Sequence, residues 1–146
     1  MLKKIDHINI VVKDLPTCKN FFLELGFQLI HEGKLSGDWV DSVTGLEKVN
    51  AQYCALGLEN SETAIELICY DSPKTLATQK KNLPNQLGFR HVAFAVSDIE
   101  SIVKELKQKG FTFFSDIQHY EPSNKKLCYF YGPEGIILEL AEYELR

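Results

Sequence analysis

The sequence predicts an α+β protein in which a βαβββ module is written twice in tandem. Two stretches carry most of this prediction: "IDHINIVVKDL" at residues 5–15 and "FRHVAFAVSDI" at residues 89–99. Each has a His near its start, then an alternating apolar run typical of a strand, and then an Asp suited to a helix N-cap. We therefore expect a single domain, with module one at residues 1–70, a linker at 71–87 and module two at 88–146.

A constant register relates the two modules. Three features recur 84 residues apart, and they are His7 and His91, Asp14 and Asp98, and the Gly-Phe pairs at 26–27 and 110–111. Near the end of each module "IELICY" matches "LELAEY", and there the spacing is 73 residues, measured from Glu66 to Glu139. The difference between these spacings makes module one 11 residues longer, most simply in an irregular loop at 33–48.

Module one is predicted to run strand, helix and then three strands. Residues 4–12 alternate, with large aliphatic side chains on one face and His7 and Asn9 on the other. Asp14 is the expected N-cap of the helix, whose apolar residues recur at helical spacing until Gly26 ends it. The next strands are expected at 27–31, 49–57 and 63–70, the last two joined by the turn-forming stretch "GLENSE".

Module two repeats this order. Its first strand begins near His91, and "SDIE" at 97–100 fits a capping box at the start of the helix. Gly110 is expected to end that helix. The remaining strands are expected at 111–117, 125–131 and 136–143, with "GPEG" as the turn between the last two.

Composition excludes several classes of protein. The net charge is −4 and no Lys/Arg cluster interleaves with aromatic residues, so we expect no nucleic-acid partner. No apolar run approaches the roughly 18 residues that a membrane span needs, so we expect no membrane partner either. No cleavage site follows the basic start, and the four cysteines show no CxxC spacing. We therefore expect free thiols and a cytoplasmic protein.

The strand faces opposite the helices carry unusual side chains. His7 and His91 stand on small, polar faces, and Glu66 and Glu139 each interrupt an apolar run, "AIELI" and "IILELA". A carboxylate on a buried face is costly unless it is paired or bound to a metal. Two imidazoles and two carboxylates predict a site for one divalent cation, such as Zn²⁺, Ni²⁺, Co²⁺, Mn²⁺ or Fe²⁺. In this interpretation each module supplies one His and one Glu.

The same residues resemble the glyoxalase, or vicinal oxygen chelate, superfamily. The resemblance is carried by "DHINIVVKDL", "FFLELGF", "AIELI", "RHVAFAVSDIESIVKELKQKGF" and "YGPEGIILEL", which span nearly the whole chain in the family's order. It implies that the two modules form an eight-stranded curved sheet, an open barrel, around a metal. It also implies that the metal ligands are His7, Glu66, His91 and Glu139, a set most similar to that of glyoxalase I.

The resemblance further implies a metal-dependent lyase or isomerase. In such enzymes the metal stabilises an enediolate or enolate of a small α-oxo or α-hydroxy carbonyl compound, and a carboxylate moves the proton. By this analogy Glu139 is the first choice for the catalytic base and Glu66 the second. We also expect a small-molecule substrate and a homodimer.

Two other functions stay open: an acyl-CoA epimerase of the methylmalonyl-CoA type, and a non-catalytic small-molecule binding or resistance protein. The intact ligand set argues against the second. The chain has only two arginines, Arg90 and Arg146, so we do not expect it to bind a glutathione thioester. Trp39, in the 33–48 segment, is either part of a lid over the substrate or a packing anchor.

Overall fold

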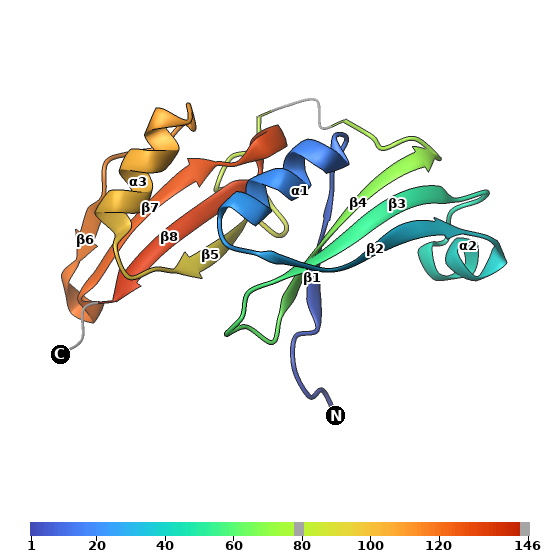
Figure 1. The fold of residues 1–146 in the computed structure, drawn as a ribbon, viewed down its shortest axis with the longest axis horizontal. Coiled ribbons are helices and arrows are strands. Elements are labelled where there is room, and N and C mark those ends of the chain that lie inside the picture. The colour runs from blue at the N-terminus through green and yellow to red at the C-terminus, as the bar shows by residue number, and fades with distance from the viewer. Residues whose placement is uncertain (78–80, 144–146) are drawn as a thin grey trace. The chain divides into compact units, whose positions relative to one another are not determined.

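The computed structural model describes residues 1–77 and 81–143. The chain divides into two compact units, Met1–Thr78 and Gln79–Arg146, and each holds its own four-stranded sheet (Figure 1). The predicted class, α+β with two βαβββ modules, is confirmed. The division between the units falls within the stretch predicted as a linker, although the last strand of the first unit continues two residues into it, to Ser72. Among the described residues, no helix is long and apolar enough to span a membrane.

The first unit contains six elements: β1 (His7–Val11), α1 (Leu15–Glu24), β2 (Gln28–Ser36), α2 (Asp38–Thr44), β3 (Asn50–Gly57) and β4 (Ala64–Ser72). The strand order is β1-β4-β3-β2, with β1 parallel to β4 and the other neighbours antiparallel. A parallel pair requires a long connection, and α1 is part of the one that joins β1 to β4. This pairing sets the first strand of the module directly beside its last.

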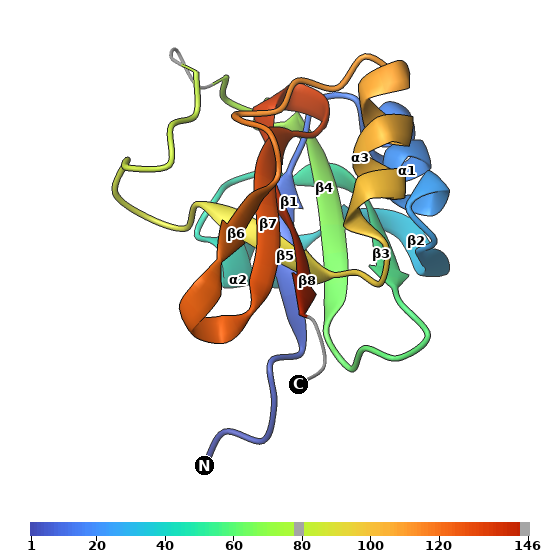
Figure 2. The ribbon, with the colours of Figure 1, turned by 90° about the vertical axis from the view of Figure 1, so that its left-hand side faces the viewer.

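The second unit repeats this arrangement with β5 (His91–Ala95), α3 (Ile99–Gln108), β6 (Gln118–Tyr120), β7 (Lys125–Tyr131) and β8 (Ile137–Tyr143). Its order is β5-β8-β7-β6, which places β7 between β8 and β6 (Figure 2). Here too the first strand is parallel to the last. Short 3₁₀ turns, Glu121–Ser123 and Pro133–Gly135, precede and follow β7.

An aspartate caps the N-terminus of each ten-residue helix. Asp14 before α1 and Asp98 before α3 each accept a hydrogen bond, 3.0 Å long, from the backbone N–H three residues later. The predicted capping box at 97–100 is therefore wrong. Because Asp98 is the cap, Glu100 is only the second helical residue, and its carboxylate accepts a hydrogen bond from Lys126 Nζ at 3.0 Å instead.

The repeated Gly-Phe pair closes both helices with the same two hydrogen bonds. Gly26 takes φ +96°, a conformation that suits glycine, and the N–H of Phe27 donates to the carbonyl of Phe22 at 3.1 Å. The rings of Phe22 and Phe27 then meet edge to face, with centroids 5.4 Å apart. Gly110 and Phe111 end α3 in the same way, so the Gly-Phe repeat in the sequence is the repeated stop signal of two helices.

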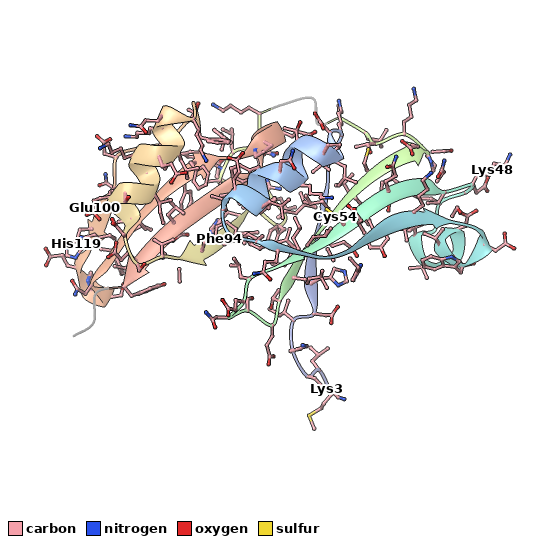
Figure 3. All side chains as sticks on the ribbon, in the orientation of Figure 1. Lys3, Lys48, Cys54, Phe94, Glu100 and His119 are labelled. Atoms are coloured by element: carbon pink, nitrogen blue, oxygen red, sulfur yellow. The ribbon has the colours of Figure 1, made fainter. Side chains whose placement is uncertain are left out.

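Each ten-residue helix covers one face of its own sheet. In the first unit α1 contacts β3 and β4, and the side chains buried between them include Cys18, Phe22, Cys54, Leu56 and Leu67. In the second unit α3 contacts β8, and the buried side chains include Ile99, Val103, Leu106, Leu138 and Leu140. Cys54, labelled in Figure 3, is fully buried in β3. All four cysteines are free thiols, as expected, and Cys69 is the one that is only partly buried.

The segment at 33–48 is not the irregular loop that we predicted. Its first residues extend β2 to Ser36, and residues 38–44 form α2. Val40 is the buried residue of this helix, and it packs on Ala51 and Ile68. The carboxylate of Asp41 accepts hydrogen bonds from the backbone N–H groups of Lys48 and Val49, each 2.8 Å long.

A second expectation also needs correction. The strand predicted at 111–117 is absent, and a three-residue strand, β6, forms later at Gln118–Tyr120. The aromatic residues of "FTFF" act as packing groups: the ring of Phe113 stacks on that of Phe130, with centroids 5.1 Å apart, and its backbone forms an isolated bridge with the same residue. The three rings are only partly covered and pack on aromatic residues of β7, and no regular strand forms at their positions.

Candidate metal centre

The parallel pairing of β1 with β4 brings His7 and Glu66 onto one face of the first sheet. In the register of this pair Asn9 lies opposite Glu66, and His7 lies two residues before Asn9 on the same face. Nε2 of His7 lies 3.7 Å from Oε1 of Glu66. The amide of Asn9 donates a hydrogen bond to the same oxygen at 3.0 Å. This face is opposite the one covered by α1, as the alternation in the sequence predicted.

Asp6 orients the His7 ring. Its Oδ2 lies 2.9 Å from Nδ1 of His7, and because a carboxylate only accepts hydrogen bonds, Nδ1 carries the proton. In the neutral ring the lone pair is then on Nε2, the nitrogen that faces Glu66. The hydrogen bond from His7 holds the pKa of Asp6 below its ordinary value, and the same bond, together with the charge of Glu66, raises the pKa of His7.

The second unit repeats this arrangement more tightly. Ala93 of β5 lies opposite Glu139 of β8, and His91 lies two residues before it on the same face. Nε2 of His91 is 3.1 Å from Oε2 of Glu139. Glu139 is only 4 % exposed and is the buried charged residue of the described core. A carboxylate so deeply buried needs a positive partner.

Two residues of β7 surround the Glu139 carboxylate. Nζ of Lys125 lies 2.5 Å from Oε1 of Glu139, and this ion pair raises the pKa of Lys125. Tyr129 lies directly opposite Glu139 in the antiparallel pair β7–β8, and its ring centroid is 4.8 Å from that of His91. Burial, and then the charge of Glu139, raise the pKa of the Tyr129 hydroxyl. One oxygen of Glu139 is therefore held by an ammonium group and the other faces an imidazole.

Each pair has the donor chemistry that a divalent transition metal takes. Imidazole nitrogen and carboxylate oxygen bind such an ion at about 2.1 Å, which places two ligand atoms on one ion roughly 3.0 to 3.4 Å apart. The two observed separations, 3.7 Å and 3.1 Å, lie near this range. Within the described residues, no three or more His, Cys, Asp or Glu side chains are placed so that they could hold a metal ion together. The donor atoms of each pair fit two of the ligands that a divalent ion takes.

His119, Trp39 and Arg90 are not members of either His-Glu pair. His119, labelled in Figure 3, lies in β6. Its Nε2 is 3.1 Å from Asn124 Oδ1. Trp39, on α2, is 59 % exposed and so is not a packing anchor within its unit. Arg90 lies outside β5, and its guanidinium donates to Gln86 Oε1 at 3.1 Å. Arg146 lies outside the described residues.

Sequence reasoning missed Asp6, the partner of His7, and the two residues of β7 beside Glu139. Asp6 adjoins His7 in "KIDHIN", and a carboxylate beside a predicted ligand is a recognisable signal for an orienting group. Lys125 and Tyr129 were not predicted, because their place beside Glu139 depends on the register of β7 against β8. The turn "GPEG" predicts that these strands pair but does not specify which residues lie opposite each other.

Known proteins share this fold and sequence pattern. The chain is 31% identical over 143 residues to the protein YwkD of Bacillus subtilis, an alignment that covers 97% of this chain and 98% of that protein. A crystal structure of a glyoxalase family protein from Bacillus cereus has a TM-score of 0.91 and 33% identity, covering 98% of this chain and 95% of the other.

A more distant structural match shows the fold alone. It is the genomically encoded fosfomycin resistance protein FosX of Listeria monocytogenes, crystallised with Mn(II) and sulfate. The TM-score is 0.67 at 16% identity, and the match covers 99% of this chain and 94% of that one.

The family profile described as Glyoxalase/Bleomycin resistance protein/Dioxygenase superfamily matches residues 4–140, a range that includes both His-Glu pairs. With the two βαβββ units and the near-complete coverage of the relatives, this match shows that the chain belongs to the glyoxalase superfamily.

Proposed function

We propose that the chain is a divalent-metal-dependent lyase or isomerase of the glyoxalase type that acts on a small α-oxo or α-hydroxy carbonyl compound. The observation that carries this proposal is the repeated pairing of an imidazole Nε2 with a carboxylate oxygen, at 3.7 Å in one unit and 3.1 Å in the other. Membership of a superfamily that contains glyoxalases supports it.

In this proposal His7, Glu66, His91 and Glu139 bind one divalent ion, with each unit supplying half of the ligands. Two carboxylates and two neutral imidazoles balance the charge of the ion. When bound, the ion supplies Lewis-acid chemistry: it stabilises the negative charge that develops on a substrate oxygen when the neighbouring carbon loses its proton.

The two glutamates are the groups that accept and return that proton. Glu139 is the first choice for the base and Glu66 the second. A carboxylate bound tightly to a cation is a weak base, so the base must be the ligand that is more easily released. Glu139 already has a second positive partner in Lys125, 2.5 Å from Oε1, that compensates its charge while it is released. The order in which we place the two residues follows the resemblance to glyoxalase I.

We also propose that the active form is a homodimer. A chain with two half-sites builds complete metal sites either by pairing its own units or by exchanging units with a second chain, and both routes give one ion per chain. Multi-angle light scattering of the purified protein measures its mass directly, and a monomer over the whole concentration range would exclude the dimer.

The experiment for this proposal measures proton removal without knowledge of the product. Metal-loaded protein is incubated in D₂O with a panel of α-hydroxy carbonyl compounds, and loss of the α-proton signal is followed by NMR. We expect exchange for at least one compound, lost on removal of the metal. Glu139→Gln keeps the shape of the side chain but does not accept the proton, so it should slow exchange more than tenfold, or about 1.4 kcal/mol of barrier. Equal exchange by the metal-free protein, or a smaller loss in Glu139→Gln, would contradict this mechanism.

A further inference from the structure

Glu66 and Glu139 occupy equivalent positions in the two units, but their second polar partners come from different strands. Glu66 receives a hydrogen bond from Asn9, its neighbour on the first strand of the module. Glu139 has Ala93 at the equivalent place, which offers no polar group. Its second partner is Lys125, which reaches it from the strand on the other side.

The strand registers show that the first unit has an alanine, Ala51, at the position equivalent to Lys125. Lys125 lies opposite Tyr143 in the pair β7–β8, and Ala51 lies opposite Tyr70 in the corresponding pair β3–β4. Ala51 is fully buried under α2 and carries no charge. The second partner of Glu66 is therefore the neutral amide of Asn9, whereas the second partner of Glu139 is the ammonium group of Lys125.

The path of the Lys125 side chain explains how it reaches the carboxylate. Lys125 and Glu139 are not opposite each other: on their face of the sheet, the pair Leu127–Ala141 lies between the pairs that contain them. The long Lys125 side chain spans this distance along the face of the sheet, and the intervening position on β8 is an alanine. Nζ then lies 2.5 Å from Glu139 Oε1, and the Lys125 side chain is only 19% exposed.

The charge balance gives this contact a role. Glu139 is a nearly buried carboxylate, and Lys125 supplies the positive charge that it needs when no metal is bound. A divalent ion held by Glu139 and His91 would supply the same compensation through Oε2, the oxygen that faces the imidazole at 3.1 Å. Two cations would then share one carboxylate and repel each other.

We propose that Lys125 is a built-in counter-ion for Glu139 that competes with the metal ion and lowers the affinity of the site for it. This inference rests on the proposed function, because it takes Glu139 as a metal ligand. Lys125 is a positioning residue: it holds the Glu139 carboxylate in place before metal binds and keeps the bond between Glu139 and the ion weak afterwards.

The test uses the substitution Lys125→Met, which keeps an unbranched side chain, one atom shorter, and removes its charge. The matched control is Lys126→Met. Lys126 is the next residue of β7, and its ammonium pairs with Glu100 of α3 at 3.0 Å, on the opposite side of the sheet from Glu139. Both variants of the full-length protein lose one positive charge, so their net charges are equal.

Two quantities are measured: the thermal midpoint of the metal-free protein and its dissociation constant for Zn²⁺ by competition calorimetry. We expect Lys125→Met to lower the metal-free midpoint, because a buried carboxylate loses its counter-ion. We expect the same variant to bind Zn²⁺ about tenfold more tightly or better, because a repelling charge near the ion is removed. Lys126→Met should leave the zinc affinity unchanged.

The double variant Lys125→Met/Glu139→Gln tests the counter-ion role without any metal. A neutral amide at position 139 needs no counter-ion, so Lys125→Met should cost much less stability in that background. An equal cost in both backgrounds would overturn this role. If Lys125→Met is too unstable to purify without metal, the comparison with the double variant is made on protein that is purified with Zn²⁺ and then stripped.

The outcomes separate the two proposals. Zinc binding by the wild type with unchanged or weaker affinity in Lys125→Met overturns the competition and leaves the metal site intact. Failure of the wild type and of every variant to bind Zn²⁺ overturns the proposed function and the competition together.

Discussion

The substrate of this protein is expected to lack the glutathione group that defines glyoxalase I. Glutathione is a tripeptide with two carboxylates, and proteins usually bind such groups through arginine or lysine. Of the two arginines, Arg90 already donates to Gln86 Oε1 at 3.1 Å and to the carbonyl of Gly88 at 3.4 Å. Its guanidinium is thus engaged locally, just before β5.

The size of the effect follows from the missing contacts. A hydrogen bond to a charged group contributes about 1.5 to 3 kcal/mol, so two unbound carboxylates forfeit about 3 to 6 kcal/mol of transition-state binding. This corresponds to a loss of roughly 10² to 10⁴ in kcat/KM relative to a well-matched enzyme. Lysines near α2, such as Lys48, offer a less directional alternative.

The assay follows formation of the thioester product from the glutathione hemithioacetal of methylglyoxal, by its ultraviolet absorbance, with metal-loaded protein. We expect little or no turnover. The control is the α-hydroxy carbonyl compound that shows proton exchange with the same preparation. Turnover of the hemithioacetal at a kcat/KM of about 10⁶ M⁻¹s⁻¹ would refute the reasoning from the arginines.

Three further predictions concern the fold. Asp98→Ala should lower the free energy of unfolding by about 1 kcal/mol in urea titrations, because Asp98 is the cap of α3, whereas Glu100→Ala should change it little. A larger loss in Glu100→Ala than in Asp98→Ala would support the capping box instead. Phe22→Ala should cost about 3 to 5 kcal/mol in the same titration, since the ring of this α1 residue is fully buried, and a cost below 1 kcal/mol would contradict that packing. Iodoacetamide should label Cys69 first in the native protein, because burial raises the pKa of Cys128 to about 11; peptide mapping that finds Cys128 labelled first would be inconsistent with this burial.

Local signals in the sequence were enough to predict most of the fold. The alternation around His7 and His91 correctly predicted which face of each first strand the helix covers. Asp14 and the Gly-Phe pairs correctly predicted where the helices begin and end, because caps act within one turn of the chain.

The errors arose where packing within the unit overrides the local pattern. The stretch "GDWVDSVTG" has too few residues to show a helical period. A helix this short depends on tertiary packing, which Val40 makes with Ile68 of β4. The partners of the glutamates depend on strand register, which alternation alone does not specify. Lys125 lies beside Glu139 because β7 pairs with β8 in one register, and a shift of one residue would turn its side chain to the other face.

Metal content is the measurement that tests the central claim most directly. Wild-type protein, His7→Ala and His91→Ala are purified without chelator and their metals are quantified by mass spectrometry, with Lys126→Met as a surface control. If the two His-Glu pairs bind one ion together, the wild type and the control hold one divalent ion per chain and each histidine variant holds almost none. Full metal content in either histidine variant, or two ions per chain in the wild type, would show that the pairs do not form a single site.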